Sequence, residues 1–169
     1  PIVATPKEFE FSVRSLLDRL GSVVLDAPRV VEIPVCYDGS VAPDLEFVAN
    51  HSGLTVDDVV RLHASVEYLV YFVGFTPGFP YLGELAEQLA TPRLAAPRLR
   101  VPEGSVAIGG NQTGIYSLPS PGGWRIIGRT PFKLFQPRES PPTLLEIGNH
   151  VRFRPVSLQG FNDILKDAD

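Results

Sequence analysis

The uneven distribution of proline and glycine constrains the fold of this chain more than any other feature of its sequence. The 169 residues contain 17 prolines and 15 glycines; both are dense between Pro77 and Pro142, whereas no proline lies between Pro43 and Pro77. Proline removes a backbone donor and fixes φ, and glycine admits dihedral angles that other residues avoid. The later stretch should therefore consist of short strands joined by tight turns.

Hydrophobic periodicity predicts the remaining elements. Residues 6–20 predict a helix, because Pro6 lies near its start and Gly21 follows its end. A second helix should open at Thr55, which has the spacing of a capping box with Asp58. The predicted helices after the first are 44–50, 55–64 and 157–166, and the predicted strands include 30–36, 105–109, 114–118, 124–127, 132–135 and 151–154, with a hairpin loop at 118–123.

The segment 67–75 gives the strongest strand signal. Both of its alternating faces are apolar, so we expect this strand to lie centrally and to be covered on two sides. Many short strands at close spacing indicate a closed or nearly closed barrel. The sequence therefore predicts a mainly β protein, a β-barrel with a few short helices.

Charge and cysteine content exclude several classes of protein. The formal net charge is −4, and prolines interrupt the neighbouring Arg93, Arg98 and Arg100. Since phosphate binding needs clustered Lys and Arg, we expect a turn-rich surface strip there and no nucleic-acid partner. Cys36 is the only cysteine, so neither an intramolecular disulfide nor a cysteine metal cluster can form, and we expect no metal site.

The sequence also bears on location. No apolar run approaches the ~18 residues that a membrane span needs, and no charged-then-apolar secretory leader opens the sequence. We therefore expect a cytoplasmic protein with no membrane partner. Because the sequence begins at Pro1 and contains no methionine, we also expect a fragment of a longer protein.

Three motifs carry candidate chemistry. The first, at 74–83, packs Phe75, Phe79 and Tyr81 among prolines and glycines. Prolines reduce the entropy of holding one loop shape, and aromatic rings supply contact area at low rotamer cost. Such a loop suits ligand or partner binding; the alternative is a turn whose rings only cap the barrel.

The second motif, at 109–116, has glycines at both ends but lacks the Lys-Ser/Thr pair of a phosphate loop. Gln112 and Thr113, with Asn111, could hold a carboxylate, an amide or a urea-like group through neutral hydrogen bonds. The alternative is that these side chains satisfy the backbone of the turn.

The third motif, at 121–131, contains Trp124, the only tryptophan, and Arg129, followed by Thr130. An arginine in this setting could clamp a carboxylate or a phosphoryl oxygen through two hydrogen bonds. The alternative is a surface ion pair of little energetic value. His63 lies on the apolar face of a predicted helix, where it is either a buried, hydrogen-bonded histidine or a proton shuttle.

Together these stretches resemble the family that comprises the B subunits of 5-oxoprolinase, the KipI proteins and the proteins labelled allophanate hydrolase subunit 1. The resemblance runs from about residue 30 to residue 156, and its three long motifs occur in the family's order. The matching stretches are 32–37, 53–63, 74–82, 91–93, 101–106, 112–116 and 120–131.

The resemblance implies an architecture. A cyclophilin-like β-barrel would occupy residues 26–156. Residues 1–25 would be the end of a small α+β N-terminal region that is mostly missing. Residues 157–169 would form a C-terminal tail that could be helical. Fold alone does not imply prolyl isomerase activity.

The resemblance also implies a role within a larger complex. Such proteins associate with a carboxyltransferase-like partner, the C or KipA type of subunit, and with a third subunit, and they hydrolyse 5-oxoproline to glutamate at the expense of ATP. ATP serves the whole complex and need not bind this chain. The alternative is a KipI-like regulator that inhibits a sporulation histidine kinase by protein–protein binding.

If the chain acts within the enzyme complex, its candidate site residues divide into catalytic and substrate-binding groups. Tyr116 would donate to a developing oxyanion, Arg129 would hold a carboxylate or phosphoryl group, and His63 is a reserve candidate for proton transfer. The candidate substrate-binding residues are Phe75, Phe79, Tyr81, Gln112, Thr113, Trp124 and Thr130.

Overall fold

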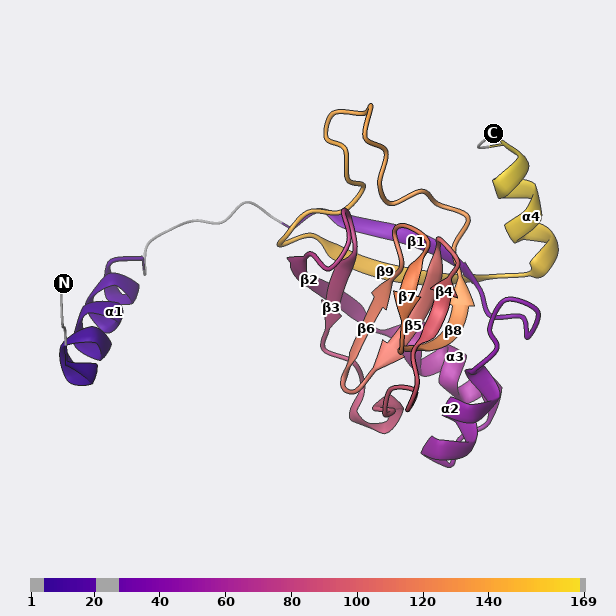
Figure 1. Ribbon diagram of the computed structural model, residues 1–169, viewed down its shortest axis with the longest axis horizontal. Coiled ribbons are helices and arrows are strands. Elements are labelled where there is room, and N and C mark those ends of the chain that lie inside the picture. Colours follow the sequence, from indigo (N-terminus) through magenta and orange to yellow (C-terminus); the bar gives the residue numbers. More distant parts are fainter. Residues whose placement is uncertain (1–4, 21–27, 168–169) are drawn as a thin grey trace.

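The computed structural model describes residues 5–20 and 28–167, and within them the chain forms a closed β-barrel with three of its helices packed against it (Figure 1). The helices are α1 (Pro6–Leu20), α2 (Leu45–Ser52), α3 (Val56–Ser65) and α4 (Leu158–Asp167), with a short 3-10 helix at Glu87–Leu89. The strands are β1 (Val30–Cys36), β2 (Glu67–Val73), β3 (Pro80–Gly83), β4 (Arg98–Val101), β5 (Ser105–Gly109), β6 (Gln112–Ile115), β7 (Ser120–Gly122), β8 (Arg125–Arg129) and β9 (His150–Val156).

The barrel follows the strand order β1-β8-β5-β6-β3-β2-β9 and closes where β9 returns to β1. This closing pair is parallel and in register from Val30 opposite His150 to Cys36 opposite Val156, whereas the other barrel pairs are antiparallel. Helix α2 packs against β8, α3 against β9, and α4 against β1. The predicted mainly β barrel with short helices is confirmed.

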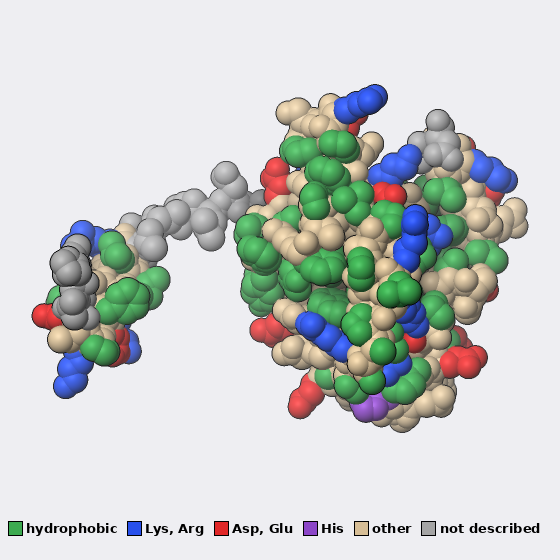
Figure 2. Space-filling model, in the orientation of Figure 1, with side chains coloured by type: hydrophobic (Ala, Val, Ile, Leu, Met, Phe, Trp, Pro, Cys, Tyr) green, Lys and Arg blue, Asp and Glu red, His purple; other side chains and the backbone are tan. Residues whose placement is uncertain are grey.

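Two hydrophobic clusters lie on opposite faces of the barrel wall. Along β5, Val106 and Ile108 belong to the large interior cluster, whereas Ala107 between them belongs to a smaller outer cluster. This follows from the two-residue period of a strand. The small β4–β7 sheet contributes Val101 to the outer cluster. Figure 2 shows hydrophobic side chains gathered over the face that carries β4 to β7.

The first predicted helix is confirmed as α1, whose apolar side chains Phe9, Leu16 and Leu17 are exposed. Residues 1–4 and 21–25 of the predicted N-terminal region lie outside the described residues, so the domain boundaries at residues 25 and 156 stay predictions. The predicted C-terminal helix is confirmed as α4. Among the described helices, none has the length and apolar character needed to cross a membrane.

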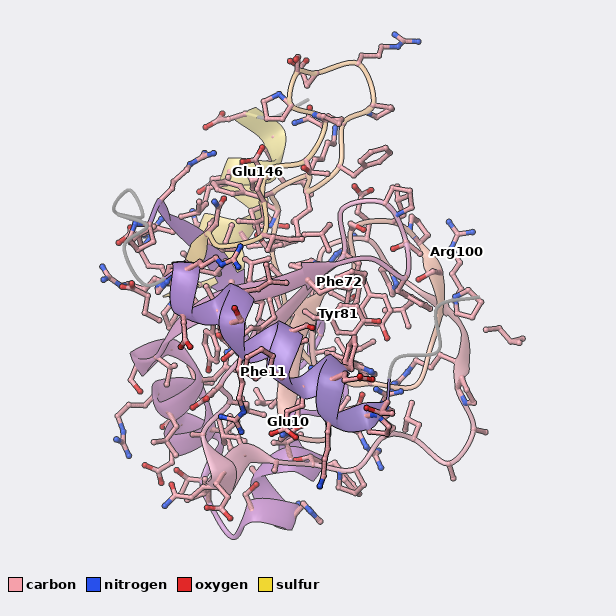
Figure 3. The ribbon with its side chains drawn as sticks, turned by 90° about the vertical axis from the view of Figure 1, so that its left-hand side faces the viewer. Glu10, Phe11, Phe72, Tyr81, Arg100 and Glu146 are labelled. Carbon is pink, nitrogen blue, oxygen red and sulfur yellow. The ribbon has the colours of Figure 1, made fainter. Side chains whose placement is uncertain are left out.

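The prediction that the strand at 67–75 is covered on both sides is wrong. The strand ends at Val73, and Tyr71 and Phe72 are 51% and 55% exposed. A barrel wall has only one face in the core, so Tyr71 on the other face remains on the surface. The β-bulge between Val70 and Phe72 interrupts the alternation and places Phe72 on the outer face as well. Phe72 packs there beside Tyr81 of β3, with ring centroids 5.9 Å apart (Figure 3).

Two further expectations are corrected. No strand forms at 132–135, where only an isolated bridge joins Phe135 to Thr143. Pro131 and Pro137 flank this segment and cannot donate to a ladder. The supposed hairpin loop at 118–123 contains β7, which pairs with β4; Arg98 is thus a strand residue and not part of a turn-rich strip.

Candidate functional site

The outer face of the barrel carries an aromatic pocket of about 280 Å³, which we call the outer pocket. Its walls come from the 74–79 loop, strand β3, the end of β6, β7 with the two residues that follow it, and the segment before β4. The lining residues are Phe75, Phe79, Tyr81, Arg93, Pro97, Tyr116, Pro121, Gly122, Gly123 and Trp124. All five aromatic residues among them were candidates from the sequence, and the fold brings them together.

Phe79 is the centre of this arrangement. Its ring is 2% exposed and meets Tyr81, Tyr116 and Trp124 edge to face, with centroid separations of 5.0, 5.3 and 5.6 Å. Phe75 adds a fourth edge contact at 5.5 Å and is 61% exposed at the rim. Edge-to-face pairs are favourable beyond their buried area, so the wall of the pocket is preorganised.

Phe75 adopts an unusual backbone conformation. Its φ is +69°, in the left-handed region that disfavours residues with a Cβ atom. The neighbouring chain holds this conformation, since Gly74 N–H donates to Phe79 O at 3.0 Å and Phe79 N–H donates to Thr76 O at 3.1 Å. Strained residues of this kind cluster at functional sites.

Two glycines make room for the rings. A Cβ atom on Gly109 would lie 2.4 Å from the Trp124 ring, and one on Gly122 would lie 2.2 Å from the Tyr116 hydroxyl oxygen. Burial raises the pKa of Tyr116, so its hydroxyl is protonated at neutral pH and can donate a hydrogen bond.

Arg93 supplies the positive charge at the pocket. Its guanidinium carbon lies 5.4 Å from the centroid of the Trp124 ring, a cation–π distance. The backbone on both sides is fixed: Thr91 and Gly110 exchange two hydrogen bonds, and Leu94 N–H donates to Gly123 O at 2.7 Å. The pocket therefore combines a largely apolar wall with one cation and the side chains of two tyrosines, Tyr81 and Tyr116.

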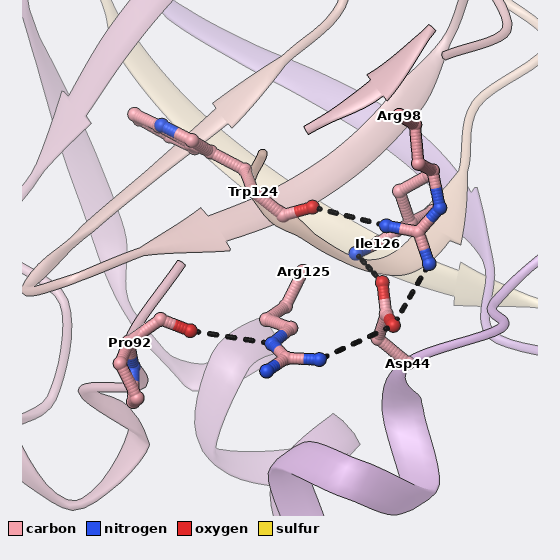
Figure 4. A network of polar contacts seen from close by, with 6 residues as sticks. All are labelled: Asp44, Pro92, Arg98, Trp124, Arg125 and Ile126. Carbon is pink, nitrogen blue, oxygen red and sulfur yellow. Dashed lines mark hydrogen bonds and ion pairs between the residues drawn. The ribbon is translucent and has the colours of Figure 1, made fainter. Parts of the chain in front are cut away.

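A buried carboxylate lies behind the pocket (Figure 4). Asp44, just before α2, accepts from Ile126 N–H at 2.7 Å and from Arg98 Nη2 at 2.9 Å, and Arg125 Nη1 lies 3.8 Å away. Arg98 also donates to the Trp124 carbonyl at 3.5 Å, and Arg125 donates to the Pro92 carbonyl at 3.2 Å. Asp44 therefore anchors two segments that form the pocket wall.

His63 lies inside the barrel and does not line the outer pocket. Its Nδ1 is 2.8 Å from the Tyr37 hydroxyl, and its Nε2 is 2.9 Å from Thr113 Oγ1. Thr113 donates its own proton to Ala107 O, so it accepts from Nε2–H, and Nδ1 accepts from Tyr37. Burial lowers the pKa of His63 to about 3, so the ring is neutral at physiological pH.

The remaining candidate residues are not brought to the outer pocket. Arg129 donates to the Glu103 carbonyl at 2.9 Å, and Thr130 Oγ1 accepts from Phe132 N–H at 3.2 Å. Thr113 is fully buried, as described above. Gln112 lines a separate surface hollow that also contains Glu84. Their predicted roles in substrate binding stay predictions.

Two residues of the site were missed. Asp44 stands before a helix, where an aspartate suggests a cap, yet its carboxylate makes no capping bond and instead binds β8, 82 residues away. Arg93 belongs to a Thr-Pro-Arg stretch that matched the family, and that match was the available signal.

The fold and the site define a class of domain that comparison with protein families identifies. Residues 1–145 match the family model described as "Carboxyltransferase domain, subdomain C and D". Among solved structures, a conserved uncharacterized protein from Pyrococcus horikoshii is 46% identical, with a TM-score of 0.77 over 95% of this chain and 74% of that one. The urea carboxylase of Kluyveromyces lactis, 20% identical with a TM-score of 0.72, covers 95% of this chain and shares its fold.

Curated relatives narrow the assignment. The 5-oxoprolinase B subunit of Escherichia coli O157:H7 is 60% identical over 127 residues, which cover 75% of this chain and 58% of that protein. The corresponding protein of Bacillus subtilis (strain 168) is 46% identical over 164 residues, which cover 95% and 68%. The chain thus spans roughly three fifths to two thirds of these relatives. It belongs to the carboxyltransferase-domain family that includes the 5-oxoprolinase B subunits.

Proposed function

We propose that this chain is part of the B subunit of an ATP-dependent 5-oxoprolinase, in which it binds the cyclic amide substrate. The supporting observation is the outer pocket: aromatic walls around Phe79 with Arg93 and the Tyr116 hydroxyl at the same hollow. A small, nearly flat ring matches such walls, and its polar groups match the cation and the donor. The 60% identity to a 5-oxoprolinase B subunit supports the choice of substrate.

In this proposal the chain binds and orients the substrate. The aromatic walls exclude water from the ring, and the protonated Tyr116 donates to the amide oxygen as negative charge develops there. No carboxylate, histidine or cysteine lies among the described residues that line the pocket, so a partner protein supplies the groups that activate water and use ATP. The sequence supports placing ATP on a partner. Gly109 and Gly114 have the spacing of a phosphate-binding loop, but Ile115 and Tyr116 stand where such a loop has Lys and Ser/Thr.

Reconstitution tests the proposal. The full-length protein is co-expressed with its carboxyltransferase-like partner and the third component, and ATP-dependent release of glutamate from 5-oxoproline is measured. We expect Trp124→Leu and Tyr116→Phe each to lower kcat/KM by about tenfold or more. Gln136→Ala, which changes an exposed residue outside the outer pocket and outside the set of candidate site residues, is the control. Wild-type turnover in both pocket variants would place the substrate elsewhere.

A second candidate function has its own supporting observation. Tyr71, Phe72 and Phe75 expose more than half of their surface on the outside of the barrel, which favours a protein-docking role such as the regulation of a histidine kinase. Phe72→Ser separates the two, since it lies outside the pocket lining. If the regulatory function holds, this variant loses kinase binding; if the enzymatic function holds, glutamate release by the complex keeps its wild-type dependence on 5-oxoproline.

A further inference from the structure

We propose that Arg93 is the anion anchor of the outer pocket and makes the site selective for small, nearly flat rings that carry one carboxylate. This inference rests on the proposed function, because it names the group of the substrate that the pocket recognises. Arg93 follows Pro92 in the segment between the 3-10 helix and β4, and its side chain reaches the mouth of the pocket beside Trp124.

The charge of Arg93 is available for a ligand. It forms no ion pair within 4.0 Å among the described residues. The nearby arginines differ. Arg98 is paired with Asp44 at 2.9 Å, and Arg129 donates to the Glu103 carbonyl. Within the part of the chain that the structure describes, Arg93 is therefore the arginine that both lines the pocket and keeps its guanidinium donors for a ligand.

The backbone that carries Arg93 is held in place before any ligand arrives. On one side, Thr91 and Gly110 exchange hydrogen bonds of 3.1 and 2.8 Å; on the other, Leu94 N–H donates to Gly123 O at 2.7 Å. Stacking on Trp124 further restricts the side chain, which lowers the entropy lost on binding. An arginine that is fixed at its base and presents a planar fork matches the geometry of a carboxylate.

The remaining walls define the rest of the ligand. Apart from Arg93, the lining is aromatic residues, prolines and glycines, so a second charged group would be buried without a partner. The volume of about 280 Å³ lies just below the roughly 300–1,000 Å³ of sites for drug-sized molecules and favours a small ligand. The Tyr116 hydroxyl offers one further polar contact, as an amide oxygen requires.

The test compares ligands that differ only in the anion. Binding of 5-oxoproline and of its carboxamide, which lacks the negative charge, is measured on the 169-residue chain by calorimetry and by the fluorescence of Trp124, the only tryptophan. We expect wild type to prefer the carboxylate by about 10- to 100-fold, in line with a charged hydrogen bond. Arg93→Gln should reduce this preference to about one, and Arg129→Gln should leave it intact.

Several results would overturn the inference. They are an unchanged preference in Arg93→Gln, loss of the preference in Arg129→Gln, failure of wild type to bind the carboxylate, and tighter binding of an uncharged proline-containing peptide than of 5-oxoproline. Circular dichroism of both variants confirms that they are folded; Arg93 is exposed, so its replacement leaves the core intact.

The two proposals fail in distinguishable ways. If the reconstituted complex releases glutamate but Arg93→Gln shows unchanged charge preference, only the anchor is wrong. If the chain binds carboxylates in an Arg93-dependent manner while the complex releases no glutamate from 5-oxoproline, the anchor stands and the proposed reaction is wrong.

Discussion

Asp44 and Ile126 are joined twice: the Asp44 N–H donates to the Ile126 carbonyl at 2.9 Å, and the Ile126 N–H donates to Asp44 Oδ2 at 2.7 Å. This pair fastens the start of α2 to β8 beside Trp124. The other carboxylate oxygen accepts from Arg98, so one side chain ties together three segments that are distant in sequence.

We therefore expect Asp44→Ala to be strongly destabilising. The side chain is 8% exposed, and its loss leaves Arg98, Arg125 and a buried N–H without their acceptor. Breaking a buried pair costs about 3–5 kcal/mol. Because Arg98 is partly exposed, we expect the free energy of unfolding, measured by urea denaturation, to fall by about 2–3 kcal/mol. The control is Glu10→Gln, which removes an exposed pair with Arg14 and should cost below about 0.5 kcal/mol. Equal losses in both variants would contradict a special role for Asp44.

Gly109→Ala should disturb the pocket directly. The added methyl group would meet the Trp124 ring at 2.4 Å, and overpacking of this kind costs about 1–3 kcal/mol. Because Trp124 is the only tryptophan, its emission spectrum should shift as the ring is displaced. Gly39→Ala is the matched control, since nothing lies within 4 Å of its Cβ position. An unaltered spectrum in Gly109→Ala would mean that the ring does not pack as described.

His63 should make stability depend on pH. Its pKa is about 3 in the folded protein because of burial, against 6.5 for an exposed imidazole, so the unfolded state binds the proton first. Neutral His63 makes its full contribution to the free energy of unfolding above pH 6.5. This contribution is lost as the pH falls towards 3, by about 1.4 kcal/mol per pH unit.

The free energy of unfolding, measured by denaturation between pH 6.5 and 4, should therefore depend less steeply on pH in His63→Gln than in wild type. The difference in slope should correspond to the uptake of about one proton on unfolding. Asn50→Gln, which changes an exposed residue that does not titrate, should keep the wild-type slope. Identical slopes in wild type and His63→Gln would show that the buried ring does not resist protonation.

Glycine should be better tolerated than alanine at position 75. Phe75 has a φ of +69°, which glycine adopts freely and alanine does not, so Phe75→Gly should exceed Phe75→Ala by about 1 kcal/mol in unfolding free energy. At Phe72, in strand β2, the order should be the opposite: the alanine variant should be more stable than the glycine variant by about 0.5–1 kcal/mol. Both Phe75 variants should bind 5-oxoproline less tightly, because both remove the rim of the pocket. The same order at both positions would exclude backbone strain at Phe75.

The sequence predicted those parts of the fold that depend on local patterns. The helices α1 and α3 have clear apolar periodicity, and the Thr55 cap of α3 is present as predicted. The aromatic members of the site were also found, since Phe75, Phe79 and Tyr81 lie within one ten-residue motif. Pairing between distant segments was not predictable: β4 is recognisable as a strand only because β7 lies beside it.

The site shows the same limit. The positive charge was assigned to Arg129 from its flanking glycine and threonine, whereas the structure brings Arg93 to the pocket through backbone pairing of Thr91 with Gly110 and of Leu94 with Gly123. Asp44 was predicted only as the start of a helix, because local sequence gives no sign of a partner 82 residues later. Residues that act through tertiary contacts escape local analysis.

The parallel pairing of β1 with β9 has a consequence for biosynthesis. Cys36 cannot meet Arg129, nor Val30 meet His150, until roughly a hundred further residues have left the ribosome, so both edges of β1 lack their partner strands in the meantime. Unpaired edges invite association with other chains. Closure late in translation makes this barrel sensitive to premature termination, and a chain truncated before β9 should aggregate instead of folding.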